Sequence, residues 1–215
     1  KPYLDKIDEL YENYNSTTNE AERTKIYATI DSVSGIAAKF AIANEYDKLM
    51  STIGAKGTNA FTWYEQTAYV NDIPSNQIEK WLTVEAERFR NPIFRIFHTE
   101  LEAVYEEKNR SLDNDDWKVS EVLLANLFQK HNYGQQTTLG TIEHLKNPSL
   151  KEIRKYFYTY YVPNNMCMIL VGDFDPDKVI KQIDEKFGNF APKEVTPYTS
   201  PQEAEITKKK KKTVY

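Results

Sequence analysis

The segment His98–Arg110 holds the residues whose types and spacing could best support chemistry. Glu100 and Glu107 stand seven residues apart in a helical pattern, so both carboxylates fall on one face of the predicted helix. Ala103 and Val104 lie between them on that face. A carboxylate held against an apolar stripe is costly unless a metal ion or a basic side chain meets it. The spacing alone favours an ordinary solvated helix face over a metal site, because the neighbouring residues are also charged.

The composition restricts the classes of function that we expect for this chain. The chain has 215 residues with a net charge of −4, 40% hydrophobic and 13% aromatic residues, which is enough for a real core. No basic patch is interleaved with aromatic residues, so we expect no nucleic-acid partner. The one strong charge run, Lys208–Lys212, is typical of a flexible solvated tail. No apolar run reaches about 18 residues, so we expect no membrane span.

The single cysteine bears on the redox state of the chain, and the first residues bear on its processing. Cys167 excludes an internal disulfide, and its apolar setting in Met166–Val171 predicts a buried, unreactive thiol. The chain opens on Lys1-Pro2 without an initiator methionine or a signal peptide, as a fragment or processed product would.

Several common catalytic motifs are missing. The sequence has no phosphate-binding loop, no dinucleotide-binding glycine pattern, no paired Cys-x-x-Cys and no Gly-x-Ser-x-Gly elbow. His98, His131 and His144 are too far apart for a local metal motif, and each is interpreted as a surface or cap residue. Nothing in these residues supports catalysis by the chain on its own.

Helices must position most of the candidate residues. Apolar stripes from Leu4 to Tyr14 and from Ile26 to Ala37 predict a helical hairpin. Thr58–Trp63 and Thr67–Ile73 predict two adjacent strands, and the apolar run Met166–Gly172 predicts a buried third one. Further helices are expected after Pro74, around Glu100 and Glu107, from Val119 to Leu127, after the Ser149/Glu152 capping pattern, and from Asp175-Pro176 to Gly188. The sum is one α+β domain preceded by a helical hairpin.

A family resemblance rests on several short segments taken in order. They are Gly57–Thr62 with Glu65–Thr67 and Tyr69, Glu85–Phe89, Glu100–Asn109, His131–Gly134 with Gly140, Tyr160–Met166, and Val171–Asp173. Together they resemble the pitrilysin/insulinase-like zinc metallopeptidases, which are marked by an inverted His-x-x-Glu-His zinc motif. The similarity covers about residues 44–192. It implies a mainly antiparallel sheet with helices packed on one face.

The resemblance also implies roles for particular residues. Glu107 matches the family's third zinc ligand, and Glu100 matches the carboxylate that supports the ligand shell seven residues earlier. Asn59, Ala60 and Phe61 match the sheet edge to which a substrate peptide adds as an extra strand. The alternative for this segment is an ordinary edge strand with exposed N–H and C=O groups.

One departure from the family pattern determines whether this chain could be catalytic on its own. His-x-x-Glu-His, which would supply two zinc ligands and the general base, does not occur in the 215 residues. The resemblance places it upstream of Lys1 in a parent polypeptide. One glutamate cannot make a catalytic zinc site, which normally needs three protein ligands. We therefore expect the chain alone to be inactive and the parent to be a zinc endopeptidase acting on peptides or small unfolded proteins.

The expected organisation follows from these points. Residues 1–43 form a hairpin insertion, 44–192 a partial peptidase-family domain, and 193–215 a linker with a basic tail. The expected cofactor is Zn²⁺ in the parent, and the expected partners are a peptide substrate and a homologous C-terminal half or second subunit. The resemblance points to the periplasm or cell envelope. Two other hypotheses stay open: a peptide-binding or scaffolding homologue without metal, and a helical interaction module in residues 1–50.

Overall fold

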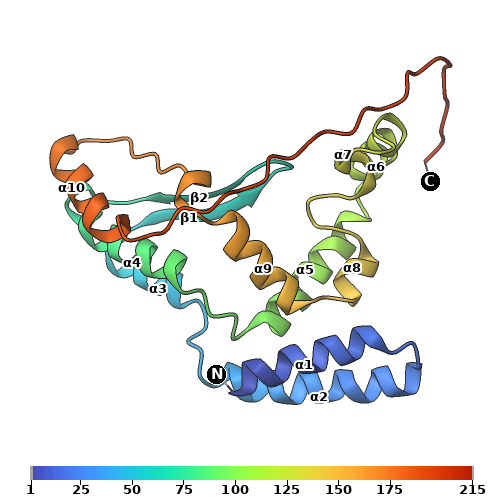
Figure 1. The fold of residues 1–215 in the computed structure, drawn as a ribbon, viewed down its shortest axis with the longest axis horizontal. Helices are drawn as coiled ribbons and strands as arrows, with labels where there is room; N and C mark the ends of the chain where they lie inside the picture. Colours follow the sequence, from blue (N-terminus) through green and yellow to red (C-terminus); the bar gives the residue numbers. More distant parts are fainter. Residues whose placement is uncertain (1, 215) are drawn as a thin grey trace.

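The computed structural model describes residues 2–214 and is shown in Figure 1. The α-helices are α1 (Pro2–Ser16), α2 (Glu20–Ala38), α3 (Glu45–Thr52), α4 (Ile78–Arg90), α5 (Phe97–Ser111), α6 (Asp115–Leu127), α7 (Asn132–Gln135), α8 (Ile142–Lys146), α9 (Leu150–Tyr160) and α10 (Pro176–Phe187). The strands are β1 (Lys56–Thr62) and β2 (Thr67–Asp72), and two short 3-10 helices are η1 (Ser75–Gln77) and η2 (Pro163–Asn165).

The architecture is α+β, as predicted. Helices dominate the described residues, and β1 and β2 form a two-stranded antiparallel sheet. Figure 1 shows this sheet beside α3, α4 and α10, while α5 to α8 form a second arm and α9 runs between the two. The predicted pair of adjacent strands is therefore confirmed.

The N-terminal helices α1 and α2 pack side by side as the predicted hairpin (Figure 1). Their core includes Tyr11, Ile30 and Leu150, whose exposed fractions are 1%, 0% and 0%. Leu150 belongs to α9, so the hairpin shares its core with the rest of the chain. Arg154 of α9 also pairs with Asp8 of α1. The hairpin therefore packs against α9 through a shared core and an ion pair.

A second core joins α4 to α10. Ile78 and Leu82 of α4 are buried against Val179 of α10. The start of α10 follows the sequence pattern, because the Asp175 side chain accepts hydrogen bonds from the backbone N–H groups of Asp177 and Lys178. This core holds α4 beside the β1–β2 hairpin.

The predicted strand at Met166–Gly172 is wrong for the described residues. The segment has no regular secondary structure, and Ile169 and Val171 are 80% and 93% exposed. The thiol of Cys167 is exposed as well, so the prediction of a buried cysteine is also wrong. A strand exists only where a neighbour takes up its backbone hydrogen bonds, and none of residues 2–214 does so here.

The C-terminal segment after α10 contains no helix or strand over residues 193–214. The Glu203 carboxylate accepts hydrogen bonds from the backbone N–H groups of Lys130 and His131, at 2.7 and 2.6 Å. No helix among the described residues is long and apolar enough to cross a bilayer. The domain boundaries at residues 43 and 192 remain predictions.

Candidate active-site elements

Helix α5 carries both candidate carboxylates. Glu100 lies in its first turn and Glu107 two turns further on, and both are exposed. Neither carboxylate forms an ion pair or a side-chain hydrogen bond with any described residue. Ala103, which lies between them, is exposed too. The expected burial against an apolar stripe is therefore absent, and both carboxylates are free to bind an external group.

The buried side chains of α5 are basic. Lys108 is 4% exposed, and its Nζ lies 2.8 Å from Oε1 of Glu121 on α6. His98 is 8% exposed, and its Nδ1 lies 2.8 Å from the Tyr11 hydroxyl of α1. These two contacts fix the position of α5 from both ends. The sequence interpretation of His98 as a surface or cap residue was wrong.

The donor set for a metal ion is incomplete in this chain. No group of three or more histidine, cysteine, aspartate or glutamate side chains is placed to hold a metal among residues 2–214. Zinc sites use three or four such ligands. Glu107 could serve as one of them, so the described residues alone do not fit a complete zinc site.

The hydrogen-bonding pattern of the β1–β2 hairpin decides which backbone groups are free. The Trp63 N–H donates to the Gln66 carbonyl at 2.8 Å and closes the turn. Bonded and non-bonded pairs alternate along an antiparallel ladder. Counting from the turn, the pair of Ala60 and Tyr69 is therefore a non-bonded one. The N–H and C=O groups of Ala60 point away from β2.

The side chain of Asn59 contacts this outward edge. Its Oδ1 accepts a hydrogen bond from the Ala60 N–H at 2.8 Å. Phe61, in a bonded pair with Ala68, exposes 51% of its surface. Of the three predicted substrate-binding residues, Ala60 thus offers an outward C=O, while its outward N–H is already bonded to the Asn59 side chain.

The tip of the hairpin contacts α7. The Tyr133 hydroxyl donates to the Glu65 carboxylate, and the rings of Tyr133 and Tyr64 lie 4.6 Å apart between centroids. The next residue, Gly134, has no room for a side chain, because a Cβ there would meet the Phe128 carbonyl oxygen at 2.0 Å. His131 caps α7 by accepting the Tyr133 N–H, as a cap interpretation predicts.

A polar network missed by the sequence interpretation links α3, α4 and β2. Glu85 of α4 is 3% exposed and accepts a hydrogen bond from the Tyr46 hydroxyl of α3. Asn71 of β2 donates to the same hydroxyl at 3.0 Å. Burial and the hydrogen bond to Glu85 raise the pKa of Tyr46 to about 12. The sequence interpretation missed this network because its three residues lie far apart in the chain and no local pattern links them.

The structure does not bring the two predicted parts of the site into contact. No hydrogen bond or ion pair within residues 2–214 joins α5 to β1. Figure 1 shows the two elements in different arms of the molecule. Within residues 2–214, the candidate residues of α5 and β1 are therefore not assembled around one point.

Comparison with known families shows to which family the chain belongs. Residues 13–141 match the family described as insulinase (peptidase family M16). The chain belongs to this family. Residues 148–215 match a second description, the peptidase M16 inactive domain. The first match begins inside α1, and the status of residues 1–43 as an insertion remains a prediction.

Several relatives of this chain are zinc proteases by name. The uncharacterized zinc protease YmfH of Bacillus subtilis is 29% identical over 147 residues, covering 67% of this chain and 32% of the relative. The insulin-degrading enzyme of Drosophila melanogaster is 29% identical over 165 residues, covering 73% of this chain and 17% of the relative. The chain thus spans a third or less of these two relatives.

Solved structures of two bacterial proteases share the fold. The first half of the periplasmic protease PqqL from Escherichia coli matches with a TM-score of 0.66 at 20% identity, covering 75% of this chain and 36% of that one. A protease from Helicobacter pylori matches with a TM-score of 0.60 at 24% identity, covering 76% of this chain and 40% of that one. Both confirm the α+β fold.

Proposed function

We propose that the chain is part of a zinc-dependent endopeptidase that hydrolyses peptides or small unfolded proteins. The hairpin pairing carries the proposal, because it leaves the backbone groups of Ala60 facing outward. An extended peptide can add to such an edge through backbone hydrogen bonds, which demand little of its sequence. The names of the M16 relatives support the reaction class.

In this proposal Glu107 is the third zinc ligand and Glu100 supports the ligand shell. Both carboxylates are exposed and unpaired among the described residues, so a ligand role breaks no existing contact. The two histidine ligands and the general base lie in the parent polypeptide outside this chain. Zinc would supply Lewis-acid chemistry there, whereas this chain supplies one carboxylate and the peptide-binding edge.

The ligand role can be tested by one substitution in the parent protein. Glu107→Gln removes the anionic ligand and should lower both the zinc content and the peptidase activity to background. Glu106→Gln is the matched control, since Glu106 is the adjacent exposed glutamate on α5. Elemental analysis gives the zinc content. Full zinc content with full activity in Glu107→Gln would rule out this assignment.

The peptide-binding edge has its own test. Ala60→Pro removes the outward N–H and leaves the ladder bonds to β2 in place, a position where an edge strand tolerates proline. Peptide hydrolysis by the parent should fall by tenfold or more, because an added strand that displaces the Asn59 side chain would find no N–H at residue 60 and would meet the proline ring. Ala60→Ser keeps the N–H and should retain activity. Equal activity of the two variants would argue against strand addition at this edge.

A second candidate function is a peptide-binding or scaffolding homologue without metal. Such a homologue would use the outward edge of β1 for peptide binding and would need no metal ligand. Zinc analysis of this chain beside its parent separates the two candidates. About one zinc per parent chain and none in the fragment supports the endopeptidase, whereas a zinc-free parent supports the binding homologue.

Partner and location are proposed on the same basis. A solved relative is described as the first half of a periplasmic protease. We place this chain in a first half, with a homologous second half or subunit completing the enzyme, in the periplasm or cell envelope. Fractionation of cells that express the parent tests the location, and its recovery only in the cytosol would contradict it.

A further inference from the structure

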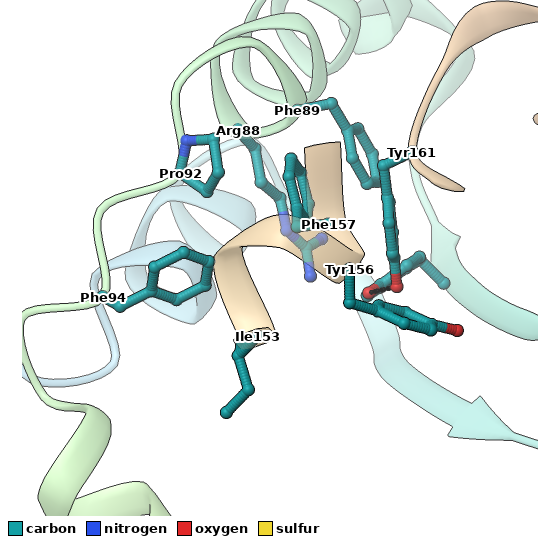
Figure 2. A pocket seen from close by; sticks show the side chains of 9 residues that line it. Arg88, Phe89, Pro92, Phe94, Ile153, Tyr156, Phe157 and Tyr161 are labelled. Atoms are coloured by element: carbon teal, nitrogen blue, oxygen red, sulfur yellow. Dashed lines mark hydrogen bonds between the residues drawn. The ribbon is translucent and has the colours of Figure 1, made fainter. Parts of the chain in front are cut away.

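A pocket of about 320 Å³ lies between α4, α9 and β2. Figure 2 shows its side chains, which are mainly aromatic: Phe94 lies at one end, Phe157 in the middle, and Phe89, Tyr161 and Tyr156 toward the other end. The rings of Phe157 and Tyr161 are stacked, with centroids 4.4 Å apart. The volume is at the lower end of the range of small-molecule sites, about 300–1,000 Å³.

Among residues 2–214, Arg88 is the one charged side chain that lines this pocket. It reaches from α4 toward α9 (Figure 2). The guanidinium carbon lies 4.1 Å from the ring centroid of Tyr46 and 4.5 Å from that of Tyr69, so aromatic faces hold the guanidinium in place. The same side chain is 32% exposed.

The guanidinium has unused hydrogen-bond donors. Its nearest carboxylate is Glu85, at 3.6 Å between Nη1 and Oε2, which is longer than a hydrogen bond. No described residue accepts a hydrogen bond from Arg88. A guanidinium carries five N–H donors in a planar fork that matches a carboxylate. Arg88 can therefore bind a second carboxylate while it neutralises Glu85.

A phenol adds a further donor to the pocket wall. The hydroxyls of Tyr69 and Tyr161 lie 2.8 Å apart, so one donates to the other and the acceptor keeps its own O–H free. Burial raises the pKa of Tyr69 above its usual value, which keeps this phenol neutral. Aromatic walls beside a cation and a neutral O–H suit a ligand with an aromatic ring and a carboxylate.

We propose that this pocket binds the C-terminal residue of a peptide when that residue is aromatic. The ring would lie against Phe94, Ile153 and Phe157, and the terminal carboxylate would face Arg88. A peptide is the favoured source, because Tyr69 in the pocket is the cross-strand neighbour of Ala60 on the proposed peptide-binding edge. The choice of a peptide thus rests on the proposed function, whereas the pocket chemistry requires neither zinc nor Glu107.

Calorimetric titration of the 215-residue chain with Gly-Gly-Phe tests the proposal. The free acid should bind, and the C-terminal amide, which has the same ring without the charge, should bind at least tenfold more weakly. Absence of binding at millimolar peptide, or equal affinity for acid and amide, would overturn the proposal. Equally tight binding of 3-phenylpropanoate would identify a small-molecule site and overturn the peptide assignment.

Two variants locate the binding site. Arg88→Gln keeps a hydrogen-bond donor but removes the charge, and it should weaken binding of the acid at least tenfold. Ile153→Trp keeps Arg88 and fills the pocket from a position that is 38% exposed, so it should block binding without disturbing the fold. Circular dichroism checks folding of both. Unchanged affinity in a folded Ile153→Trp variant would overturn the proposed location.

The failure of this site can be told apart from failure of the proposed function. Binding of Gly-Gly-Phe is measured on the 215-residue chain without zinc, whereas the proposed function is measured as peptide hydrolysis by the parent. A parent that does not hydrolyse peptides, beside a chain that binds Gly-Gly-Phe more tightly than its amide, would overturn the proposed function and support the pocket assignment.

Discussion

At the scale of single residues, position 134 requires glycine because the surrounding backbone leaves no room for a side chain. A Cβ at this position would lie 2.0 Å from the Phe128 carbonyl oxygen and 2.6 Å from that of Leu124. Gly134→Ala should destabilise the chain by about 1–3 kcal/mol, because backbone atoms must move. Gly35→Ala, at an open position within α2, should instead stabilise it by about 0.5–1 kcal/mol. Urea denaturation measures both, and equal effects would contradict the packing described.

The buried pair of His98 and Tyr11 supports a second prediction. His98→Ala leaves the Tyr11 hydroxyl buried without its partner, which should cost about 1–3 kcal/mol of unfolding free energy. The exposed His144→Ala should change it by no more than about 0.5 kcal/mol. Adding Tyr11→Phe to His98→Ala should recover part of the loss in denaturant titrations. No recovery would mean that the hydrogen bond is not the cause.

Alkaline pH should weaken the fold through Tyr46. Its pKa is raised from 10.0 to about 12 by burial and by the Glu85 carboxylate. The unfolded chain therefore ionises first as the pH rises. The stabilisation is complete below pH 10 and is lost as the pH rises through about 12. Tyr46→Phe should make the decline of unfolding free energy between these two values shallower. A decline as steep as in the wild type would exclude Tyr46 as a contributor.

At the scale of secondary-structure elements, local sequence patterns predicted an element correctly where the residues that determine it lie within that element. Ser149 caps α9 by accepting the Glu152 N–H, as the capping pattern predicts. The strand pair was predictable because β-forming residues flank a short turn. The strand at Met166–Gly172 was not, because an apolar run does not show whether a partner strand is present.

The exposed segment Met166–Val171 should promote aggregation. Unpaired backbone groups beside apolar side chains offer an edge for pairing with another chain. Ile169→Lys places a charge in this segment and should slow aggregation of the concentrated chain, as followed by light scattering. Ile206→Lys is the control, since Ile206 is 60% exposed but lies outside any apolar run. Equal slowing by both variants would point to net charge as the cause.

At the scale of the whole molecule, the hairpin and the body depend on each other. Removal of residues 1–43 would expose Leu150 and leave Arg154 without Asp8. We expect the truncated chain to lose its cooperative melting transition and to precipitate. A soluble truncated chain that melts cooperatively would contradict this and would restore residues 1–50 as a separable interaction module.

The candidate site was predictable in parts only. Resemblance indicated Glu107 and the segment Asn59–Phe61, because each is a short motif on one element. The outward direction of the Ala60 backbone required the strand register. The pocket around Arg88 combines residues from α4, α9 and β2, and no local sequence pattern predicts that these residues lie close together.

The contacts between the helical hairpin and α9 also set an order of events during synthesis. Asn15 donates to the carbonyl of Pro148, and Asp8 pairs with Arg154, across separations of 133 and 146 residues. Ribosomes add about 5–20 residues per second. The first helices therefore wait on the order of ten seconds for their partners to emerge. During this interval Tyr11 and Ile30 are available to chaperones, and slower translation should lengthen that exposure.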